Sequence, residues 1–209
     1  IKADIIPCPK HFPGHGNTTI DSHLDLPIED SDMQRLQNIE LVPFKKAFKS
    51  RVEMVMTSHI LFKKIDPEWP VTLSSHFLKN IIRETLRFQK GLIVTDDLDM
   101  KALTKKYDRA QIAVRALQAG ANILLYCNEP DSPKIALEAI TKAIESGALM
   151  LQEVTATYKA IIRFKSSKLS HSEPFEKSKI AEIVGHPDHF KLSQAIAAGH
   201  VPLELLEQA

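Results

Sequence analysis

The segment KHFPGHGNTTIDSHLDLP, Lys10 to Pro27, concentrates side chains that can exchange protons. It holds three histidines, a lysine and two aspartates, in a stretch that prolines and glycines keep from forming a regular helix. Asp21 stands two residues before His23, and a carboxylate beside an imidazole can hold the ring's orientation and raise its basicity. The same spacing is typical of a hydrogen-bonded turn. The residues alone therefore leave a proton-transfer pair and a local turn both open.

A metal site is a further interpretation of this segment. His11, His15 and His23 offer three nitrogen ligands, with Asp21 as a carboxylate that orients one of them. The spacing is not a familiar zinc pattern, because a Pro-Gly pair interrupts the helix that would present two histidines four residues apart. We therefore expect no metal and no cofactor, and a metal-dependent hydrolase is the last alternative.

A second cluster of carboxylates, Asp96-Asp97-Leu98-Asp99, follows the apolar run Gly91–Thr95. A carboxylate at the end of a strand can act as a nucleophile on a sugar carbon or as a metal ligand. Asp97 and Asp99 better suit an N-cap and a favourable charge at the start of the next helix. Asp96 comes directly after the buried run, and we expect it to point into a pocket.

The elements that must position these side chains are indicated by the hydrophobic pattern. Four short apolar runs have the length of strands buried on both faces of a parallel sheet. They are Ile1–Cys8, Val52–Thr57, Gly91–Thr95 and Ala121–Cys127. Helical patterns lie between and after them. They are a helix capped by Ser74 or Ser75 that runs to Leu86, Tyr107–Ala119 ended by Gly120, Ile135–Ser146 begun at Asp131-Ser132-Pro133, and Gln152–Phe164.

This alternation predicts β/α units around a parallel sheet, hence an α/β fold. Functional groups of such folds collect at the C-terminal ends of the strands, where we expect one pocket. The residues that follow the four runs, and are expected around it, are Lys10, His11, His59, Asp96, Asp97 and Cys127-Asn128-Glu129. Four units are half of an eight-unit barrel. The sequence therefore predicts the C-terminal half of a (β/α)8 TIM barrel over residues 1–165.

The character of the chain changes after Lys165. The segment KSSKLSHSEPFEKSK is polar, and short helical patterns follow around Gln194 and Leu203. We expect residues 166–209 to form a C-terminal extension that packs on the barrel.

Composition excludes several classes of function. A net charge of +1, with 44% hydrophobic and 25% charged residues, gives no reason to expect nucleic acid or an acidic membrane surface as the partner. No apolar run approaches the roughly 18 residues that span a bilayer, and the N-terminus lacks a signal-peptide layout. Cys8 and Cys127 lie in apolar runs and are expected as buried, reduced thiols. A cytoplasmic protein is the expectation.

Four segments taken together resemble a known family. They are KHFPGHGNTTIDSHLDLP, LVPFKKAF, VEMVMTSHI and GLIVTDDLDMKAL, in this order and at these spacings. They look like glycoside hydrolase family 3, and the PGHG and DSH elements resemble its bacterial β-N-acetylglucosaminidase branch. The likeness covers residues 1–165. It implies a retaining exo-β-N-acetylglucosaminidase with no cofactor.

The resemblance also implies roles for single residues. His23 matches the family's general acid/base, Asp21 its partner in an Asp-His dyad, and Asp96 the nucleophile. The substrate-binding residues are Lys10 and His11, which match a pair that hydrogen-bonds sugar hydroxyls, and His59, which lines the same pocket. Asn17 stands where the family more often has aspartate. A histidine acid/base agrees with the chemistry, because its ordinary pKa near 6.5 allows it to give and take a proton near neutral pH.

The implied substrate is a small glycoside, a muropeptide fragment of peptidoglycan recycled in the cytoplasm. One alternative on the same fold is a phosphorylase that passes the sugar to phosphate. Another is an inactive fragment that serves as a binding module. The family's barrel also uses an Arg and an Asp from its N-terminal half, and we expect that half in the same chain or in a second one.

Overall fold

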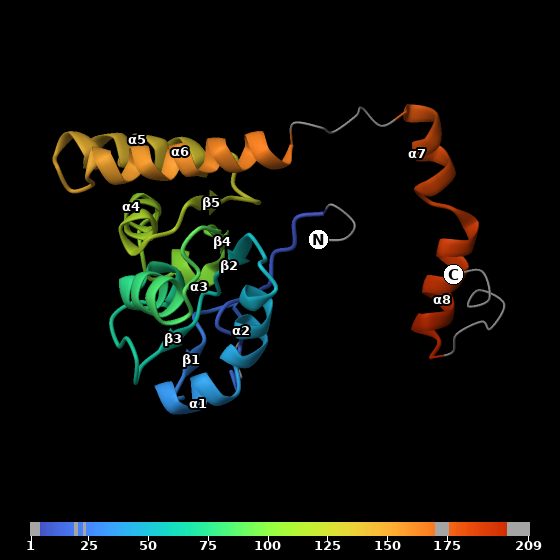
Figure 1. Ribbon diagram of the computed structural model, residues 1–209, viewed down its shortest axis with the longest axis horizontal. Coiled ribbons are helices and arrows are strands. Elements are labelled where there is room, and N and C mark those ends of the chain that lie inside the picture. The colour runs from blue at the N-terminus through green and yellow to red at the C-terminus, as the bar shows by residue number, and fades with distance from the viewer. Residues whose placement is uncertain (1–4, 19–20, 23, 170–175, 200–209) are drawn as a thin grey trace. The chain divides into compact units, whose positions relative to one another are not determined.

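A computed structural model describes residues 5–18, 21–22, 24–169 and 176–199. It divides into two compact units, residues 1–164 and 165–209. In the first unit short strands alternate with helices along the chain (Figure 1).

A parallel sheet forms the centre of the first unit. It contains β2 (Met54–Met56), β4 (Leu92–Asp97) and β5 (Ile123–Leu125), with β4 hydrogen-bonded to both neighbours. Three of the predicted strands are therefore confirmed, with β2 and β5 shorter than the apolar runs that predicted them. A separate parallel pair joins β1 (Ile28–Glu29) to β3 (Leu61–Phe62), and the apolar pattern did not predict it.

The strand predicted at Ile1–Cys8 is wrong in its position. Residues 1–4 lie outside the described part of the chain, and residues 5–8 have no regular structure. The chain instead pairs with the end of β2 over Pro9–Phe12. There the Phe12 N–H donates to the Met56 carbonyl at 2.7 Å and the Ser58 N–H donates to the Phe12 carbonyl at 2.8 Å. Two prolines, at positions 7 and 9, remove backbone donors that a regular strand would need.

Helices follow the strands in chain order. They are α1 (Met33–Asn38), α2 (Leu41–Lys49), the short 3₁₀ turn η1 (Val71–Leu73), the π-helix η2 (His76–Thr85), α3 (Lys101–Thr104), α4 (Arg109–Ala119), α5 (Ser132–Glu145) and α6 (Leu151–Lys168). The predicted helices appear as η2, α4, α5 and α6, whereas α1, α2 and α3 were not predicted. α4 packs against both α5 and η1, and α1 packs against α2.

The predicted boundaries at Ser74 and Gly120, and the start of α4 at Asp108, which was not predicted, have a physical basis in the structure. The Ser74 hydroxyl accepts from the Phe77 N–H at 3.1 Å, which satisfies a donor at the start of η2. The Asp108 carboxylate caps α4 by accepting from Ala110 and Gln111. Gly120 ends α4 with a φ of 114°, a conformation that favours glycine.

The hydrophobic core of the first unit lies between the strands and the helices. Phe12, Val55 and Ile93, which come from three adjacent strand segments, are fully buried there. Phe12 packs edge-on against Phe44 of α2, with ring centroids 5.1 Å apart. This packing fixes the strand ends from which the polar side chains project.

The second unit contains α7 (Lys177–Ile183) and α8 (Pro187–Ala197). α8 includes Gln194 and so confirms the helix predicted there, whereas the helix expected around Leu203 lies outside the described residues. The packing of residues 166–209 on the first unit stays a prediction.

The two cysteines are free. The prediction of two buried thiols is wrong for Cys127, which is exposed, while Cys8 is half-buried. Cys127 lies beyond the end of β5, so it belongs to a surface loop rather than to the apolar strand before it. Of the helices in the described ranges, none has the length and apolar character needed to cross a membrane.

Candidate active site

Asp96 lies at the C-terminal end of β4. Side chains alternate along a strand, so Asp96 faces away from the side that carries Ile93, Thr95 and Asp97, all of which are buried. The Asp96 carboxylate is 22% exposed, and its Oδ1 accepts from the Asp97 N–H at 2.8 Å. This leaves its Oδ2 facing the end of the neighbouring strands.

His11, which stands near the start of the chain, lies beside Asp96 in the structure. The His11 Nε2 lies 3.5 Å from the Asp96 Oδ2, and the His11 side chain is 29% exposed. The bridge between Phe12 and Thr57 places His11 there, because it aligns residues 9–12 beside β2, which in turn pairs with β4. The ring of His15 lies edge-on to that of His11, with centroids 5.8 Å apart. Lys10 is exposed at the same strand end.

His59 lies behind this pair and is only 1% exposed. Its Nε2 lies 2.9 Å from the Asp97 carbonyl, which can only accept, so Nε2 carries a proton and donates it. Burial lowers the pKa of His59, against the opposing influence of the Asp97 carbonyl and of Asp96, so the ring is neutral. Its Nδ1 lies 2.8 Å from the Thr72 hydroxyl, which in turn donates to the Ser58 carbonyl at 2.9 Å.

The two ring nitrogens of His59 are therefore both used inside the protein. The bond to the Asp97 carbonyl holds the backbone one residue beyond Asp96. This geometry favours a positioning role, and the substrate contact predicted for His59 stays a prediction.

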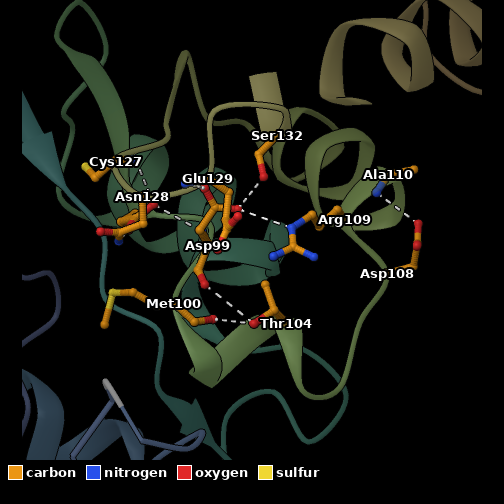
Figure 2. A network of polar contacts seen from close by, with 11 residues as sticks. Asp99, Met100, Thr104, Asp108, Arg109, Ala110, Cys127, Asn128, Glu129 and Ser132 are labelled. Atoms are coloured by element: carbon orange, nitrogen blue, oxygen red, sulfur yellow. Dashed lines mark hydrogen bonds and ion pairs between the residues drawn. The ribbon is translucent and has the colours of Figure 1, made fainter. Parts of the chain in front are cut away.

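Asp97 and Asp99 tie β4 to the loop after β5. The Asp97 carboxylate accepts from the Cys127 N–H at 3.1 Å and from the Asn128 side-chain amide at 2.5 Å. Asp99, whose side chain is 1% exposed, accepts from the Ser132 hydroxyl at 2.6 Å and the Glu129 N–H at 3.3 Å (Figure 2).

The prediction that these two carboxylates cap the following helix is wrong. The N-cap of α3 is Met100, and it makes no side-chain capping bond. Asp97 accepts from the Cys127 N–H and Asp99 from the Glu129 N–H, and each donor lies about 30 residues further along the sequence. No local sequence pattern reveals these partners. Asp97 is buried on the side of β4 opposite to Asp96.

We predict that Asp99→Ala lowers the free energy of unfolding by about 2–4 kcal/mol. The substitution leaves the buried Ser132 hydroxyl and the Glu129 N–H without their acceptor. The ion pair with Arg109, 3.4 Å long, adds little because the Arg109 side chain is 40% exposed. Urea unfolding of the full-length protein measures the change. Asp108→Ala, which removes only the cap of α4, is the control and costs about 1 kcal/mol; equal losses for the two variants contradict the prediction.

The loop that carries the predicted dyad is described only in part. The Asp21 carbonyl accepts from the Leu24 N–H at 2.9 Å and the Asp25 N–H at 3.1 Å, so Asp21 begins a tight turn. His23 lies outside the described residues. The pairing of Asp21 with His23 therefore stays a prediction. Within the described ranges no three His, Cys, Asp or Glu side chains form a group that could hold a metal ion. The metal site considered for His11, His15 and His23 includes His23, so this finding does not test it.

Glu29 is a buried carboxylate that the sequence patterns missed. It is 7% exposed and lies against Gly16 and Asn17 of the loop, where its Oε2 accepts from the Asn17 N–H at 2.9 Å. The residue stands in the polar run IEDSD, whose composition is typical of a solvated turn. No signal in the sequence distinguishes it from its acidic neighbours.

A comparison with known protein families identifies the family to which this chain belongs. Residues 2–164 match the model described as the glycosyl hydrolase family 3 N-terminal domain. The chain belongs to glycosyl hydrolase family 3. The family's N-terminal domain has a TIM-barrel-type fold, and the parallel β/α units described above are part of such a barrel, which confirms the predicted fold class.

Several family 3 proteins are similar to this chain. A β-hexosaminidase of Glaesserella parasuis is 40% identical over 123 residues, which are 58% of this chain and 36% of that protein. A β-N-acetylglucosaminidase structure from a Paenibacillus species has a TM-score of 0.79 and 34% identity, covering 84% of this chain and 34% of its own. Zinc-bound CbsA of Thermotoga neapolitana has a TM-score of 0.76 and 34% identity, covering 86% and 39%. The chain thus spans between a third and two fifths of these proteins' lengths.

Proposed function

We propose that the complete protein is a retaining exo-β-N-acetylglucosaminidase that releases terminal N-acetyl-β-D-glucosamine. The observation that carries the proposal is the approach of the His11 Nε2 to the Asp96 Oδ2, 3.5 Å apart at the ends of adjacent strand segments. It joins the two motifs that resemble the family's nucleophile and substrate-binding pair. The names of the similar proteins, β-hexosaminidase and β-N-acetylglucosaminidase, support the same activity.

In the first half-reaction the Asp96 carboxylate attacks the anomeric carbon and forms a glycosyl ester. The bond from that carbon to the leaving oxygen breaks, and His23 donates its proton to the leaving oxygen. In the second half-reaction neutral His23 takes a proton from water, the water oxygen attacks the anomeric carbon, and Asp96 leaves as carboxylate. Two displacements at one carbon retain its configuration.

The surrounding residues support this sequence. His11 and Lys10 lie at the same strand end as Asp96, where their ring and ammonium groups can bind sugar hydroxyls. His59 and the bonds of Asp97 hold the backbone of the nucleophile in place. We further propose muropeptide fragments as the substrate and the cytoplasm as the location, both from the family resemblance.

A phosphorylase on the same fold is the second candidate. A neutral or cationic His23 repels phosphate less than a carboxylate acid/base would, so phosphate can approach the glycosyl ester as an acceptor.

We predict that an aryl N-acetyl-β-glucosaminide gives the β-anomer of N-acetylglucosamine as first product, at a rate that exhaustive chelation does not change. Proton NMR of the full-length protein's reaction distinguishes the outcomes. A first-formed α-anomer contradicts the retaining mechanism, and N-acetylglucosamine 1-phosphate as main product at millimolar phosphate establishes the phosphorylase. Because a similar structure is zinc-bound, activity lost on chelation and restored by zinc favours the metal-dependent alternative.

A further inference from the structure

Asp96 lies in an irregular part of β4. In the pairing of β4 with β5, Val94 stands opposite Ile123, and Asp97 stands opposite Leu125. The three steps from 94 to 97 along β4 therefore match the two steps from 123 to 125 along β5, so β4 carries one extra residue there. Such an insertion is a β-bulge, which bends its strand and turns the side chains within it. The bulge thus affects where the Asp96 carboxylate is directed.

The hydroxyl of Thr95 connects the two strands inside this bulge. Thr95 is fully buried, and its Oγ1 accepts from the Leu125 N–H at 3.0 Å. Regular pairing resumes beyond the bulge, where the Leu98 N–H donates to the Leu125 carbonyl at 2.9 Å. The Thr95 side chain therefore joins the bulge to a residue of β5 that is itself paired, directly before Asp96.

The residue after Asp96 is held from the other side of β4. The His59 Nε2 donates to the Asp97 carbonyl at 2.9 Å, and His59 follows β2, the neighbour of β4 opposite to β5. The Asp97 N–H in turn donates to the Asp96 Oδ1 at 2.8 Å. The two residues that flank Asp96 are thus bonded to different parts of the sheet, and the backbone between them orients its carboxylate.

We propose that Thr95 is a positioning residue for the nucleophile, because its hydroxyl fixes the bulge that carries Asp96. The inference rests on the proposed function, in which Asp96 attacks the sugar. Without the bond to Leu125 the bulge shifts more freely, and the Asp96 Oδ2 spends less time in line with the anomeric carbon. Misplacement by about 1 Å costs on the order of 10²-fold in rate. The hydroxyl carries no charge, so it acts on the position of the carboxylate and not on its pKa.

The test substitutes Thr95 in the full-length protein. Thr95→Val keeps the shape of the side chain and removes the acceptor, whereas Thr95→Ser keeps the hydroxyl. For Thr95→Val we expect kcat/KM to fall about 10–100-fold for activated and poor leaving groups alike, because Asp96 attacks in both cases. Thr95→Ser should stay within about threefold of the wild type. Equal losses for the two variants, no loss for Thr95→Val, or a loss confined to poor leaving groups overturns the inference.

Thr95→Cys keeps the decision open to experiment if Thr95→Val does not fold. Sulfur is a weak acceptor, so kcat/KM of this variant should lie between those of the serine and valine variants. A cysteine variant as active as Thr95→Ser overturns the inference.

Two further measurements separate position from binding and from charge. The inhibition constant of N-acetylglucosamine and the pH dependence of kcat/KM should both remain those of the wild type, because the buried hydroxyl is uncharged and lies away from the surface where a sugar binds. Weaker inhibition in proportion to the lost activity, or a shifted pH profile, contradicts a positioning role.

Asn122→Ala is the matched control at the other end of β4. The Asn122 Oδ1 also accepts from a backbone N–H of the sheet, that of Ile93 at 2.8 Å, and it accepts from the Arg83 guanidinium at 2.7 Å. The substitution therefore weakens the same part of the fold, but away from the bulge. We expect a lower unfolding midpoint and a kcat/KM within about threefold of the wild type. A loss of kcat/KM as large as that of Thr95→Val overturns the inference, since any loosening of β4 would then suffice.

Hydrogen exchange separates a failure of this inference from a failure of the proposed function. Peptides that cover residues 123–127 should exchange faster in Thr95→Val than in the wild type, and at the wild-type rate in Thr95→Ser. Unchanged exchange in Thr95→Val refutes the role of the hydroxyl in the bulge, whatever the activity. If the wild type cleaves neither kind of substrate, the proposed function fails and with it the catalytic consequence, while the exchange data still decide whether Thr95 holds the bulge.

Discussion

Asp96→Asn in the full-length protein lowers kcat/KM for every N-acetyl-β-glucosaminide by about 10⁴–10⁶-fold, the range found when a covalent nucleophile is removed. Formation and breakdown of the glycosyl ester both pass through this carboxylate, so the loss is similar for good and poor leaving groups. Steady-state kinetics with both kinds of substrate, together with a search for the glycosyl ester by intact mass spectrometry, measures the effect.

The structure predicts that this loss of activity occurs without a comparable loss of stability. Asp96 is partly exposed, and its Oδ1 accepts from the adjoining Asp97 N–H, so the substitution should change the unfolding midpoint little. Asp108→Ala provides the opposite control, because it removes the cap of α4 at a cost of about 1 kcal/mol and leaves kcat/KM unchanged. An Asp96→Asn variant that still forms the glycosyl ester contradicts the assignment.

His23→Ala slows cleavage of a poor, basic leaving group by about 10²–10⁴-fold, the usual contribution of a general acid. An activated aryl leaving group departs without a proton, so ester formation is affected far less and its breakdown limits turnover. Added azide should then partly restore the rate and yield the β-glycosyl azide, because azide attacks the ester without help from a base. Stopped-flow measurement of the aryl burst, with and without azide, follows the two steps separately.

Asp21→Ala serves as the graded comparison for His23. It removes the orienting carboxylate and leaves the imidazole, so its leaving-group dependence should have the same direction and a smaller size. Equal losses for His23→Ala across all leaving groups, with no azide effect, would mean that another residue transfers the proton.

The sequence predicted three of the strand ends and the side chains that follow them, and it misplaced the first strand. The apolar run Gly91–Thr95 was long enough to indicate β4, and Asp96 was selected because it comes directly after that run. Gly120 and Asp131-Ser132-Pro133 marked helix boundaries because their preferences are local. By contrast, β1 and β3 have two residues each, too few for any period to show, and Pro43 in the first turn of α2 obscured the start of that helix.

What the sequence by itself determined is the set of reactive residue types, their order and the β/α units that carry them, since each depends on neighbours within one turn or one strand. Only the tertiary structure decided which groups meet. His11 reaches Asp96 across 85 positions, Asp97 reaches the loop after β5 across about 30, and Glu29 reaches Asn17 across 12. The first two contacts form because the strands pair in parallel and return the chain to the same edge of the sheet, and no local pattern records that return.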